Sequence, residues 1–329
     1  MRAFQIAALD GPDALEAVER PEPEPSHFTS PGSGVVIDVR AAGVSFPDLL
    51  QSRGLYQLKP DLPFVPGGEV AGTVVSATDG FSAGDRVAAM TILGGFAERA
   101  VAPVGLCFRL PSALSFTEGA GLVLNYHTAL FALQTRGRLI AGETVLVHGA
   151  AGGVGTAALQ VARGLGARTI AVVSSDAKER VAREAGADEV VRSDGPWREQ
   201  AVEASDGGVD LVLDPVGGDR FTDSLRSLRE GGRVVVVGFT GGGIPEVRVN
   251  RLLLNNVSVI GAGWGAYAMG KPDYLRETAA ELERMIEAGH VRPVVGVRLP
   301  FDEAAEALRV IDRREALGKV VLERSVSPR

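Results

Sequence analysis

The sequence has one cysteine, Cys107, in 329 residues. A single cysteine excludes an internal disulfide framework and any metal site built from several thiolates. It lies in a strand-like segment, where we expect a small buried hydrophobic residue. An excess of basic residues is also absent, because the formal net charge is -7 and the isoelectric point is near 5.3. The resulting field repels phosphate backbones and anionic membrane surfaces, so nucleic acid is not an expected partner.

Long apolar runs are missing as well. No segment approaches the roughly 20 residues of a membrane-spanning helix. The N-terminal residues lack the basic start and continuous apolar core of a signal peptide. We therefore expect a cytoplasmic protein with no membrane partner. What is present, 45% hydrophobic and 23% charged residues, is typical of a globular chain. At this length two domains are expected, since single cores stop growing near roughly 250 to 300 residues.

Residues 1–121 show short alternating segments separated by glycine and proline, which predict a small, mostly antiparallel β domain. Residues 267–329 are predicted to complete this domain. The clearest predicted strands are Val35–Val39, Glu69–Ser76, Arg86–Met90, Ala97–Ala102 and Lys319–Glu323, and the predicted helices are Asp273–Ala288 and Asp302–Arg313.

The pattern changes over residues 122–266, where apolar strand-like segments alternate with segments of helical length and periodicity. Such strands need both faces of their sheet covered, so we predict a parallel, doubly wound α/β domain. The predicted strands are 144–148, 169–174, 189–191, 210–214, 233–238 and 257–261, and the predicted helices are 154–165, 177–185, 197–204 and 218–228.

A glycine-rich turn joins the first predicted strand of this α/β domain to the following helix. Ala150, Gly152 and Gly155 take the three glycine positions of the G-x-G-x-x-G pattern, and its place inside a βαβ unit makes the match informative. Gly152 would let the backbone approach a pyrophosphate, and Gly155 would let helix and strand pack closely. The N–H groups at the helix start would hold the anion. The predicted dinucleotide contacts are Ala151, Gly152, Gly153, Val154 and Gly155.

The end of the second predicted strand indicates which dinucleotide binds. NAD sites carry an acidic residue there, which binds the ribose 2′-hydroxyl. This chain has Ser174 and Ser175, with Lys178 just beyond. Hydroxyl and ammonium groups bind a 2′-phosphate, whereas a carboxylate repels it, so NADPH is the predicted cofactor. Asp176 leaves two interpretations open, a helix cap or a ribose ligand.

Several further motifs run through the whole chain. They are Ala42–Asp48, Arg53–Tyr56, Pro66–Gly72, Gly84–Val87, Asn125–Ala129, Asp214–Gly218 and Gly318–Leu322. Together with the glycine turn, these motifs resemble those of the zinc-independent quinone oxidoreductases, the zeta-crystallin-like branch of the medium-chain dehydrogenase/reductase superfamily. The resemblance implies a Rossmann domain joined to a GroES-like β domain.

The resemblance also indicates what the site lacks. Zinc-containing alcohol dehydrogenases of the same superfamily carry a cysteine at the position of Ser45 and a histidine at the position of Gly68. The four-cysteine structural zinc loop is missing too, so no metal is expected. Without zinc to polarise an alcohol or a carbonyl, the expected acceptors are quinones, or alkenes conjugated to a carbonyl.

Further cofactor contacts follow from the resemblance alone. It places the nicotinamide near one helix residue and one loop, and the 2′-phosphate near three residues. A tyrosine that assists this phosphate in some members is replaced in this chain, and a nearby arginine is a candidate to serve instead. The implied contacts are Thr128, Gly238, Phe239 and Thr240 for the nicotinamide, Ser174, Lys178 and Arg314 for the phosphate, and Arg192 as the substitute.

Reduction leaves negative charge on the acceptor oxygen, which needs hydrogen-bond donors. Tyr56 resembles the tyrosine that lines the quinone cleft in the family, and a tyrosine that only packs is an equal alternative. Ser45 stands where many members carry asparagine, so its contact would be shorter or water-mediated. Asp48 lies at an expected helix start, where a capping role competes with a substrate contact. His127 is expected in the core rather than as an acid.

The leading functional hypothesis is an NADPH-dependent reductase of small quinones. The alternative enzyme is an enone or enoyl-thioester reductase with the same hydride geometry. A non-enzymatic alternative is an NADPH-binding sensor or structural protein. The apolar strand Val257–Gly261 resembles the family's edge strand that pairs with a second subunit, so we expect a homodimer.

Overall fold

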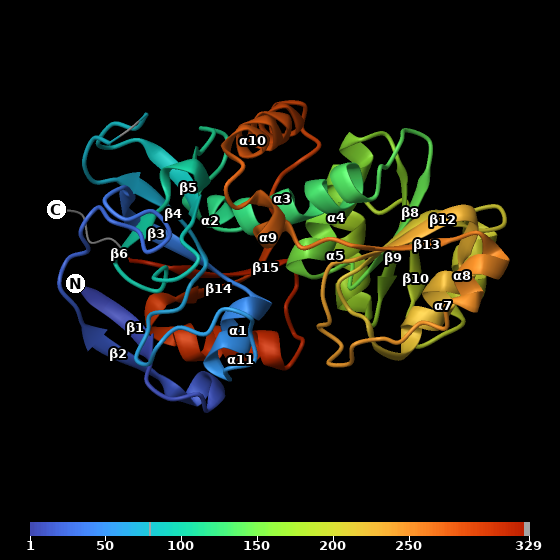
Figure 1. Ribbon diagram of the computed structural model, residues 1–329, viewed down its shortest axis with the longest axis horizontal. Coiled ribbons are helices and arrows are strands. Elements are labelled where there is room, and N and C mark those ends of the chain that lie inside the picture. The colour runs from blue at the N-terminus through green and yellow to red at the C-terminus, as the bar shows by residue number, and fades with distance from the viewer. Residues whose placement is uncertain (79, 326–329) are drawn as a thin grey trace. The chain divides into compact units, whose positions relative to one another are not determined.

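The computed structural model describes residues 1–78 and 80–325, and the chain divides into two compact units (Figure 1). The first unit consists of Met1–Leu124 together with the chain from Pro293 onward. The second unit, Asn125–Arg292, is inserted between these two segments of the first. No helix in the described part of the chain combines the length and hydrophobicity that a membrane crossing requires.

The second unit is built on a six-stranded parallel sheet with the order β10-β9-β8-β11-β12-β13. In the unit's own chain order this is 3-2-1-4-5-6, the order of dinucleotide-binding folds, in which ligands bind where the strand order reverses. That point lies between β8 and β11. The strands are β8 (Thr144–His148), β9 (Arg168–Val173), β10 (Glu189–Arg192), β11 (Val209–Asp214), β12 (Leu228–Val236) and β13 (Ser258–Gly261).

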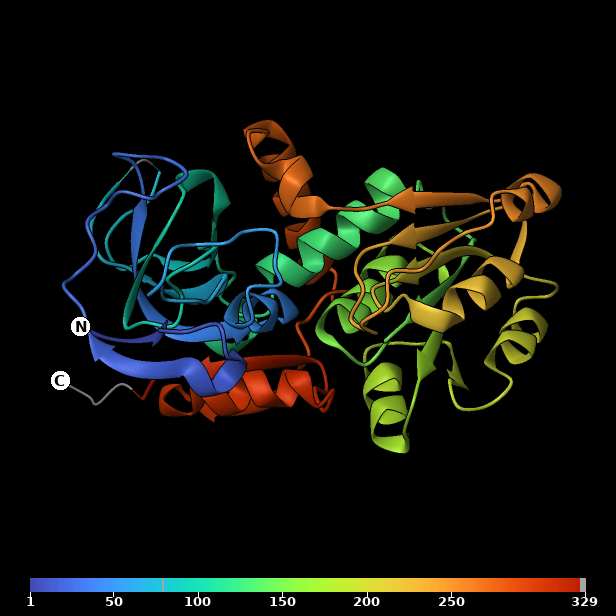
Figure 2. The same cartoon turned by 60° about the horizontal axis from the view of Figure 1, so that its bottom comes forward.

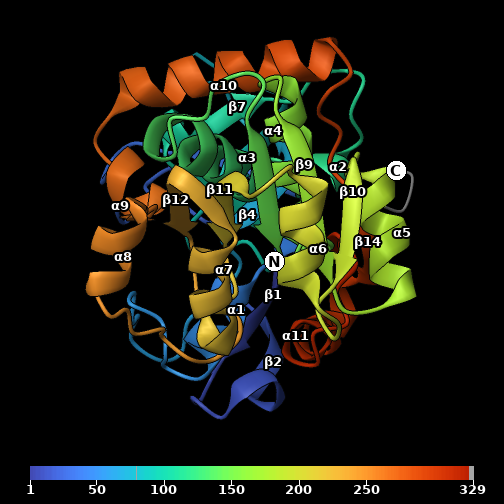
Figure 3. The same cartoon turned by 90° about the vertical axis from the view of Figure 1, so that its right-hand side faces the viewer.

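Helices cover this sheet (Figure 3). Alternate residues of each strand point to opposite faces. Leu146 and Val212 lie in one core with Trp197 of α6 and Phe221 of α7, whereas Val145, also fully buried, faces the other side. The helices are α3 (Val123–Leu130), which continues as a π-helical turn (Phe131–Arg136), α4 (Gly153–Gly164), α5 (Asp176–Glu184), α6 (Trp197–Ala204), α7 (Phe221–Arg226), α8 (Asn250–Asn255), α9 (Trp264–Ala268) and α10 (Pro272–Glu287).

The first unit contains a two-stranded β1-β2 sheet and a seven-stranded sheet of order β14-β15-β3-β4-β5-β7, with β6 also pairing with β3. Every pair is antiparallel except β14 with β15. The strands are β1 (Arg2–Ile6), β2 (Leu15–Glu19), β3 (Val35–Val44), β4 (Glu69–Val74), β5 (Arg86–Met90), β6 (Arg99–Ala102), β7 (Cys107–Arg109), β14 (Val295–Pro300) and β15 (Lys319–Glu323), and the helices are α1 (Phe46–Ser52), α2 (Phe116–Gly119) and α11 (Ala304–Asp312).

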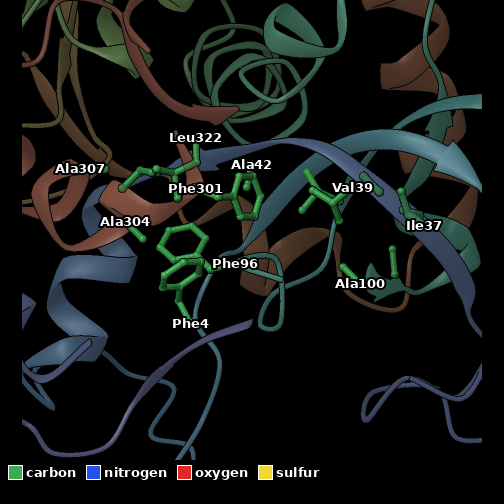
Figure 4. Packing of buried hydrophobic residues seen from close by; sticks show 14 of the residues in the cluster. Phe4, Ile37, Val39, Ala42, Phe96, Ala100, Phe301, Ala304, Ala307 and Leu322 are labelled. Atoms are coloured by element: carbon green, nitrogen blue, oxygen red, sulfur yellow. The ribbon is translucent and has the colours of Figure 1, made fainter. Parts of the chain in front are cut away.

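The two ends of the chain share the core of this first unit. Phe4 and Phe96 from the N-terminal part pack near Phe301 and Leu322 from the C-terminal part (Figure 4). Helix α11 lies beside the turn between β1 and β2 (Figure 2), where Arg309 forms an ion pair with Asp13. The last strand is therefore part of the core of this unit.

The register of three neighbouring strands brings polar residues together. Strand β15 pairs with β3 so that Val320 lies opposite Val44, and β3 pairs with β4 so that Gly43 lies opposite Glu69. Lys319, at the start of β15, and Ser45, just after β3, therefore meet at the same end of the sheet as Glu69. The lysine is 274 residues from Ser45 and 250 from Glu69 in the sequence.

The predicted fold class is confirmed: the second unit has a parallel, doubly wound α/β sheet and the first has a mostly antiparallel sheet. The predicted domain boundaries, 1–121 with 267–329 and 122–266, remain a prediction. Packing in the structure groups α10 with the second unit, where Met285 lies against Gly164 of α4. Strand β14 is missing from the predicted elements because Gly296 and Pro300, two residues that disfavour strands, lie within it.

Candidate functional site

The glycine turn follows β8 at the point where the strand order reverses. Gly149 has φ 57°, a left-handed conformation that favours glycine. Gly152 is the N-cap of α4, and its carbonyl accepts the first bond of the helix, from Thr156 N–H at 2.9 Å. The N–H groups of Gly153, Val154 and Gly155 precede that bond, and such first-turn donors have no partner within the helix. Donors at a helix start of this kind are suited to bind an anion.

Two glycines of this turn lack a side chain for different reasons. A Cβ at Gly155 would lie 2.2 Å from Gly149 O and 2.6 Å from Ala150 Cα, so only glycine lets the helix start pack on the turn. A Cβ at Gly152 would meet only Gly149 O, at 3.4 Å, which is an ordinary contact. Packing within the chain therefore does not explain glycine at 152. The contact of Gly152 with a pyrophosphate remains a prediction.

Four predicted phosphate-site residues lie together at the ends of β9 and β10. Ser175 is the N-cap of α5 and accepts from Lys178 N–H at 3.3 Å. The Lys178 ammonium donates to Ser174 Oγ at 3.2 Å, and Arg192 donates to the Ser174 carbonyl at 3.3 Å. Asp176 is the first residue of α5 rather than its cap, and its carboxylate is ion-paired with Arg192 at 2.5 Å. Hydroxyl, ammonium and guanidinium groups therefore gather beside two carboxylates, those of Asp176 and Asp194, which both pair with Arg192.

The predicted nicotinamide contacts also belong to the second unit. The loop after β12 is held to the end of β11, because Thr240 N–H and its hydroxyl both donate to Pro215 O, at 3.0 and 3.1 Å. Thr128 is 8% exposed on α3, and Phe239 is 37% exposed on the loop. Arg314 lies after α11 in the first unit, so it belongs to a different unit from Ser174 and Lys178.

His127 lies in the core of the second unit. It is 3% exposed, and its ring packs against Trp264 with centroids 5.4 Å apart. Trp264 is equally buried, and Tyr267 packs against Phe131 at 4.8 Å. Aromatic packing accounts for these positions without a chemical role.

The first unit contains a buried polar cluster made of Ser45, Asp48, Glu69 and Lys319. Lys319 Nζ lies 2.7 Å from Ser45 Oγ and 2.8 Å from Glu69 Oε2. The sequence motifs contain all four residues, yet Glu69 and Lys319 were not among the predicted site residues. Their pairing could have been suspected from the sequence, because Lys319 begins a strand whose next three residues are apolar. A lysine is almost never fully buried unless it is paired.

Asp48 holds the backbone of this cluster. It is the third residue of α1, and its carboxylate accepts from Ser45 N–H at 2.8 Å and from Gly67 N–H at 3.1 Å. Burial raises the pKa of Asp48 to about 6, although these hydrogen bonds and the charge of Lys319 oppose that rise. Tyr56, half-buried just after α1, also has a raised pKa, first because of burial and then because of the Asp48 charge. The Tyr56 phenol therefore keeps its proton at neutral pH and is available as a donor.

We expect the raised pKa of Asp48 to make the stability of the protein depend on pH. Between about pH 4 and 6 the folded chain retains a proton on Asp48 that the unfolded chain has released, because the ordinary value is 3.8. The free energy of unfolding should therefore fall by up to about 3 kcal/mol as the pH rises through this window. Asp48→Asn lacks this titration. Urea unfolding followed by circular dichroism should show the stability of the wild type relative to Asp48→Asn declining over that range, and a constant difference would contradict the assignment.

Comparison with known proteins gives two family matches. Residues 31–112 match the alcohol dehydrogenase GroES-like domain, and residues 153–284 match the zinc-binding dehydrogenase family. The chain is 38% identical to quinone oxidoreductase-like protein 2 of Bos taurus, covering 98% of this chain and 92% of that protein. It is 35% identical to the quinone oxidoreductase of Rattus norvegicus, covering 98% and 97%. The quinone oxidoreductase of Thermus thermophilus, whose structure was also solved as its NADPH complex, superposes with a TM-score of 0.82 at 37% identity, covering 98% and 100%.

Proposed function

This chain belongs to the quinone oxidoreductase family of the medium-chain dehydrogenases/reductases, and we propose from this that it reduces small quinones with NADPH. The observation that carries the proposal is the glycine turn at the reversal of the strand order, with open space at Gly152 and the Ser174–Lys178 cluster nearby. A relative of known structure binds NADPH. The chain is accordingly an NADPH-dependent oxidoreductase. That its electron acceptor is a quinone is what we propose beyond this.

The residues of the second unit would hold the cofactor by charge and by backbone N–H groups. The first turn of α4 would bind the pyrophosphate, and Ser174 and Lys178 would bind the 2′-phosphate. Arg192 pairs with the carboxylates of both Asp176 and Asp194, which weakens the repulsion between these carboxylates and the phosphate. When bound, NADPH supplies the hydride for the reduction.

The residues of the first unit would stabilise charge on the acceptor oxygen. Tyr56 is a protonated phenol, and Ser45 is a hydroxyl that already accepts from an ammonium, so both are oriented donors. Asp48 fixes the backbone on which Ser45 stands. Proton transfer from a side chain is not required, since solvent delivers the proton and the chain positions the acceptor.

We further propose that the reaction is zinc-independent. Ser45 stands where zinc relatives place a cysteine, and its oxygen is occupied by the Lys319 ammonium at 2.7 Å. Gly68, at the position of their histidine ligand, has no side chain to offer. A divalent cation beside a buried ammonium would meet strong repulsion. This arrangement favours acceptors that take hydride without a Lewis acid.

The proposed activity is tested by following NADPH absorbance with purified protein and a panel of ortho- and para-quinones, enones and enoyl thioesters. Quinone-dependent oxidation faster than with the other acceptors supports the proposal. Reduction of enones alone would replace quinones by conjugated alkenes as the substrate class. Tight NADPH binding without turnover of any acceptor would show a binding protein rather than a reductase.

Lys178→Ala should shift the cofactor preference. Loss of a charge-assisted phosphate contact costs roughly 1.5 to 3 kcal/mol, so the Kd for NADPH should rise roughly 10- to 150-fold while that for NADH stays constant. Arg180→Ala, which removes an equal charge at another position of the same helix, is the matched control. Fluorescence titration with both dinucleotides measures the effect. Equal weakening of NADPH and NADH would show that Lys178 does not contact the 2′-phosphate.

We also propose that two copies of the chain associate through β13, the edge strand of the second unit's sheet. Val259 of that strand is 37% exposed, and Leu253 and Leu254 of the preceding helix α8 are each 75% exposed. Unpaired strand edges and clustered apolar side chains favour association. Light scattering should give twice the chain mass of 34.3 kDa, and Leu253→Glu with Leu254→Glu should halve it. A monomeric wild type at micromolar concentration would refute the proposal.

A further inference from the structure

A pair of charges is buried in the first unit at the ends of three neighbouring strands. The Lys319 ammonium donates to Glu69 Oε2 at 2.8 Å and to Ser45 Oγ at 2.7 Å, and the lysine side chain is 4% exposed. Glu69 is fully buried, and its other oxygen accepts from Leu124 N–H at 2.9 Å. Buried charges are tolerated only where they are paired and hydrogen-bonded. Both conditions are met, and the Lys319 ammonium also donates to the Ser45 hydroxyl.

The backbone around Lys319 is shaped to admit its side chain. A Cβ at Gly43 would lie 2.6 Å from Lys319 Cε, and one at Gly121 would lie 3.2 Å from Lys319 Cγ. Position 43 cannot accept a larger residue, because the same Cβ would lie 2.1 Å from the backbone oxygen of Ala120. Glycines therefore line the path of the lysine to Ser45.

The Ser45 hydroxyl is left free to act outward. Ser45 is the N-cap of α1 and forms a capping box with Asp48, in which a serine oxygen only accepts from backbone N–H, so the cap does not use the hydroxyl hydrogen. An ammonium only donates, so Ser45 Oγ must accept from Lys319 and direct its own hydrogen elsewhere. Within residues 1–78 and 80–325, no acceptor for that hydrogen is found. A hydroxyl that accepts a charge-assisted bond becomes a stronger donor, because linked hydrogen bonds polarise one another.

We propose that Lys319 is a positioning residue that makes the Ser45 hydroxyl the hydrogen-bond donor to the oxygen of the electron acceptor. The inference rests on the proposed reduction of a quinone or conjugated carbonyl. Hydride released by cleavage of a C–H bond of NADPH adds to the acceptor, one π bond breaks, and its electron pair moves to the carbonyl oxygen. One proton from solvent then completes the two-electron-reduced product, and NADP⁺ is the oxidised product. Ser45 stabilises the negative oxygen, while Lys319 stays hydrogen-bonded to Ser45 and to Glu69.

A mutant cycle tests whether Lys319 acts through Ser45. Ser45→Ala should lower kcat roughly 10- to 100-fold, as expected for loss of an oxyanion donor. Lys319→Met combined with Glu69→Gln removes both buried charges together and should lower kcat by a similar factor. The triple variant should be no slower than Ser45→Ala, and the Kd for NADPH should stay constant in all three. Arg324→Met with Asp38→Asn, which removes another ion pair of the same unit, should leave kcat unchanged.

The outcomes separate the inference from the proposed activity. Losses that multiply in the triple variant, or an unchanged kcat after removal of the Lys319–Glu69 pair, overturn the inference while the quinone activity stands. Binding of 4-nitrophenolate, a stable mimic of the negative oxygen, gives a readout that needs no turnover. The wild type should shift the titration of the bound phenol to lower pH, and Ser45→Ala and the charge-pair variant should abolish that shift equally. Absence of the shift in the wild type, whether or not quinones are reduced, also overturns the inference.

Discussion

Gly155→Ala is expected to abolish NADPH binding and to destabilise the second unit. The added Cβ would lie 2.2 Å from Gly149 O and 2.6 Å from Ala150 Cα, and both obstacles are backbone atoms that no side-chain rotation can move. The start of α4 must then move away from the turn, and overpacking of this kind typically costs about 1–3 kcal/mol. Because the same displacement misdirects the N–H groups of the first helical turn, the anion site is lost along with the packing.

Gly152→Ala provides the matched comparison, since it should lose binding without losing stability. Its Cβ would meet only Gly149 O at 3.4 Å, so the folded chain accepts it, but the methyl group would occupy the space assigned to the pyrophosphate. Gly265→Ala, where nothing lies within 4 Å of the added Cβ, should change neither property.

Tryptophan fluorescence reports on this comparison, because Trp197 and Trp264 both lie in the second unit. Urea unfolding monitored by that fluorescence measures stability, and NADPH titration measures binding. A stable Gly152→Ala variant that binds NADPH with unchanged affinity would show that the dinucleotide does not lie against this turn. A Gly155→Ala variant as stable as the wild type would show that the close contact relaxes without cost.

The glycine turn was predictable from the sequence because everything that defines it is local. A strand, three small residues at fixed spacing and a helix all fall within 21 residues, from Thr144 to Gly164. The residues proposed to bind the 2′-phosphate follow at a spacing set by one helix and one strand, so the sequence could also indicate that Ser174, Ser175 and Lys178 lie together. The sequence left Asp176 open between two roles, and its ion pair with Arg192 depends on β10 lying beside β9, a pairing that the local pattern does not fix.

The buried cluster of the first unit was not predictable in the same way. Lys319 meets Ser45 across 274 positions in sequence and Glu69 across 250, and that meeting depends on the register between β15, β3 and β4. A one-residue slip in register would turn each side chain to the opposite face. Nothing in the composition of the segment around Lys319 specifies that register. The resemblance to family motifs identified each of these segments separately, but it does not predict an ion pair between them.

Lys319→Met alone is expected to cost about 3–5 kcal/mol of stability, the usual penalty for breaking a buried ion pair by removing one partner. Glu69 would remain fully buried, and among the described residues its carboxylate would keep one hydrogen bond, from Leu124 N–H to its other oxygen. Adding Glu69→Gln removes the unpaired buried charge and should restore most of the lost stability, because neutral replacements of buried ion pairs are often tolerated. The double variant should therefore be much more stable than the sum of the two single substitutions predicts.

Hydrogen exchange of β3 and β15 amides, together with urea unfolding followed by circular dichroism, resolves this effect within the first unit. Arg324→Met is the matched control, since its ion pair with Asp38 joins the same two parts of the chain but is 18% and 25% exposed. That partly exposed pair should contribute only about 1 kcal/mol. If Lys319→Met were no more destabilising than Arg324→Met, water would have to reach Glu69. The Ser45 hydroxyl would then be hydrated, and the argument for a donor held by a buried ammonium would fail with it.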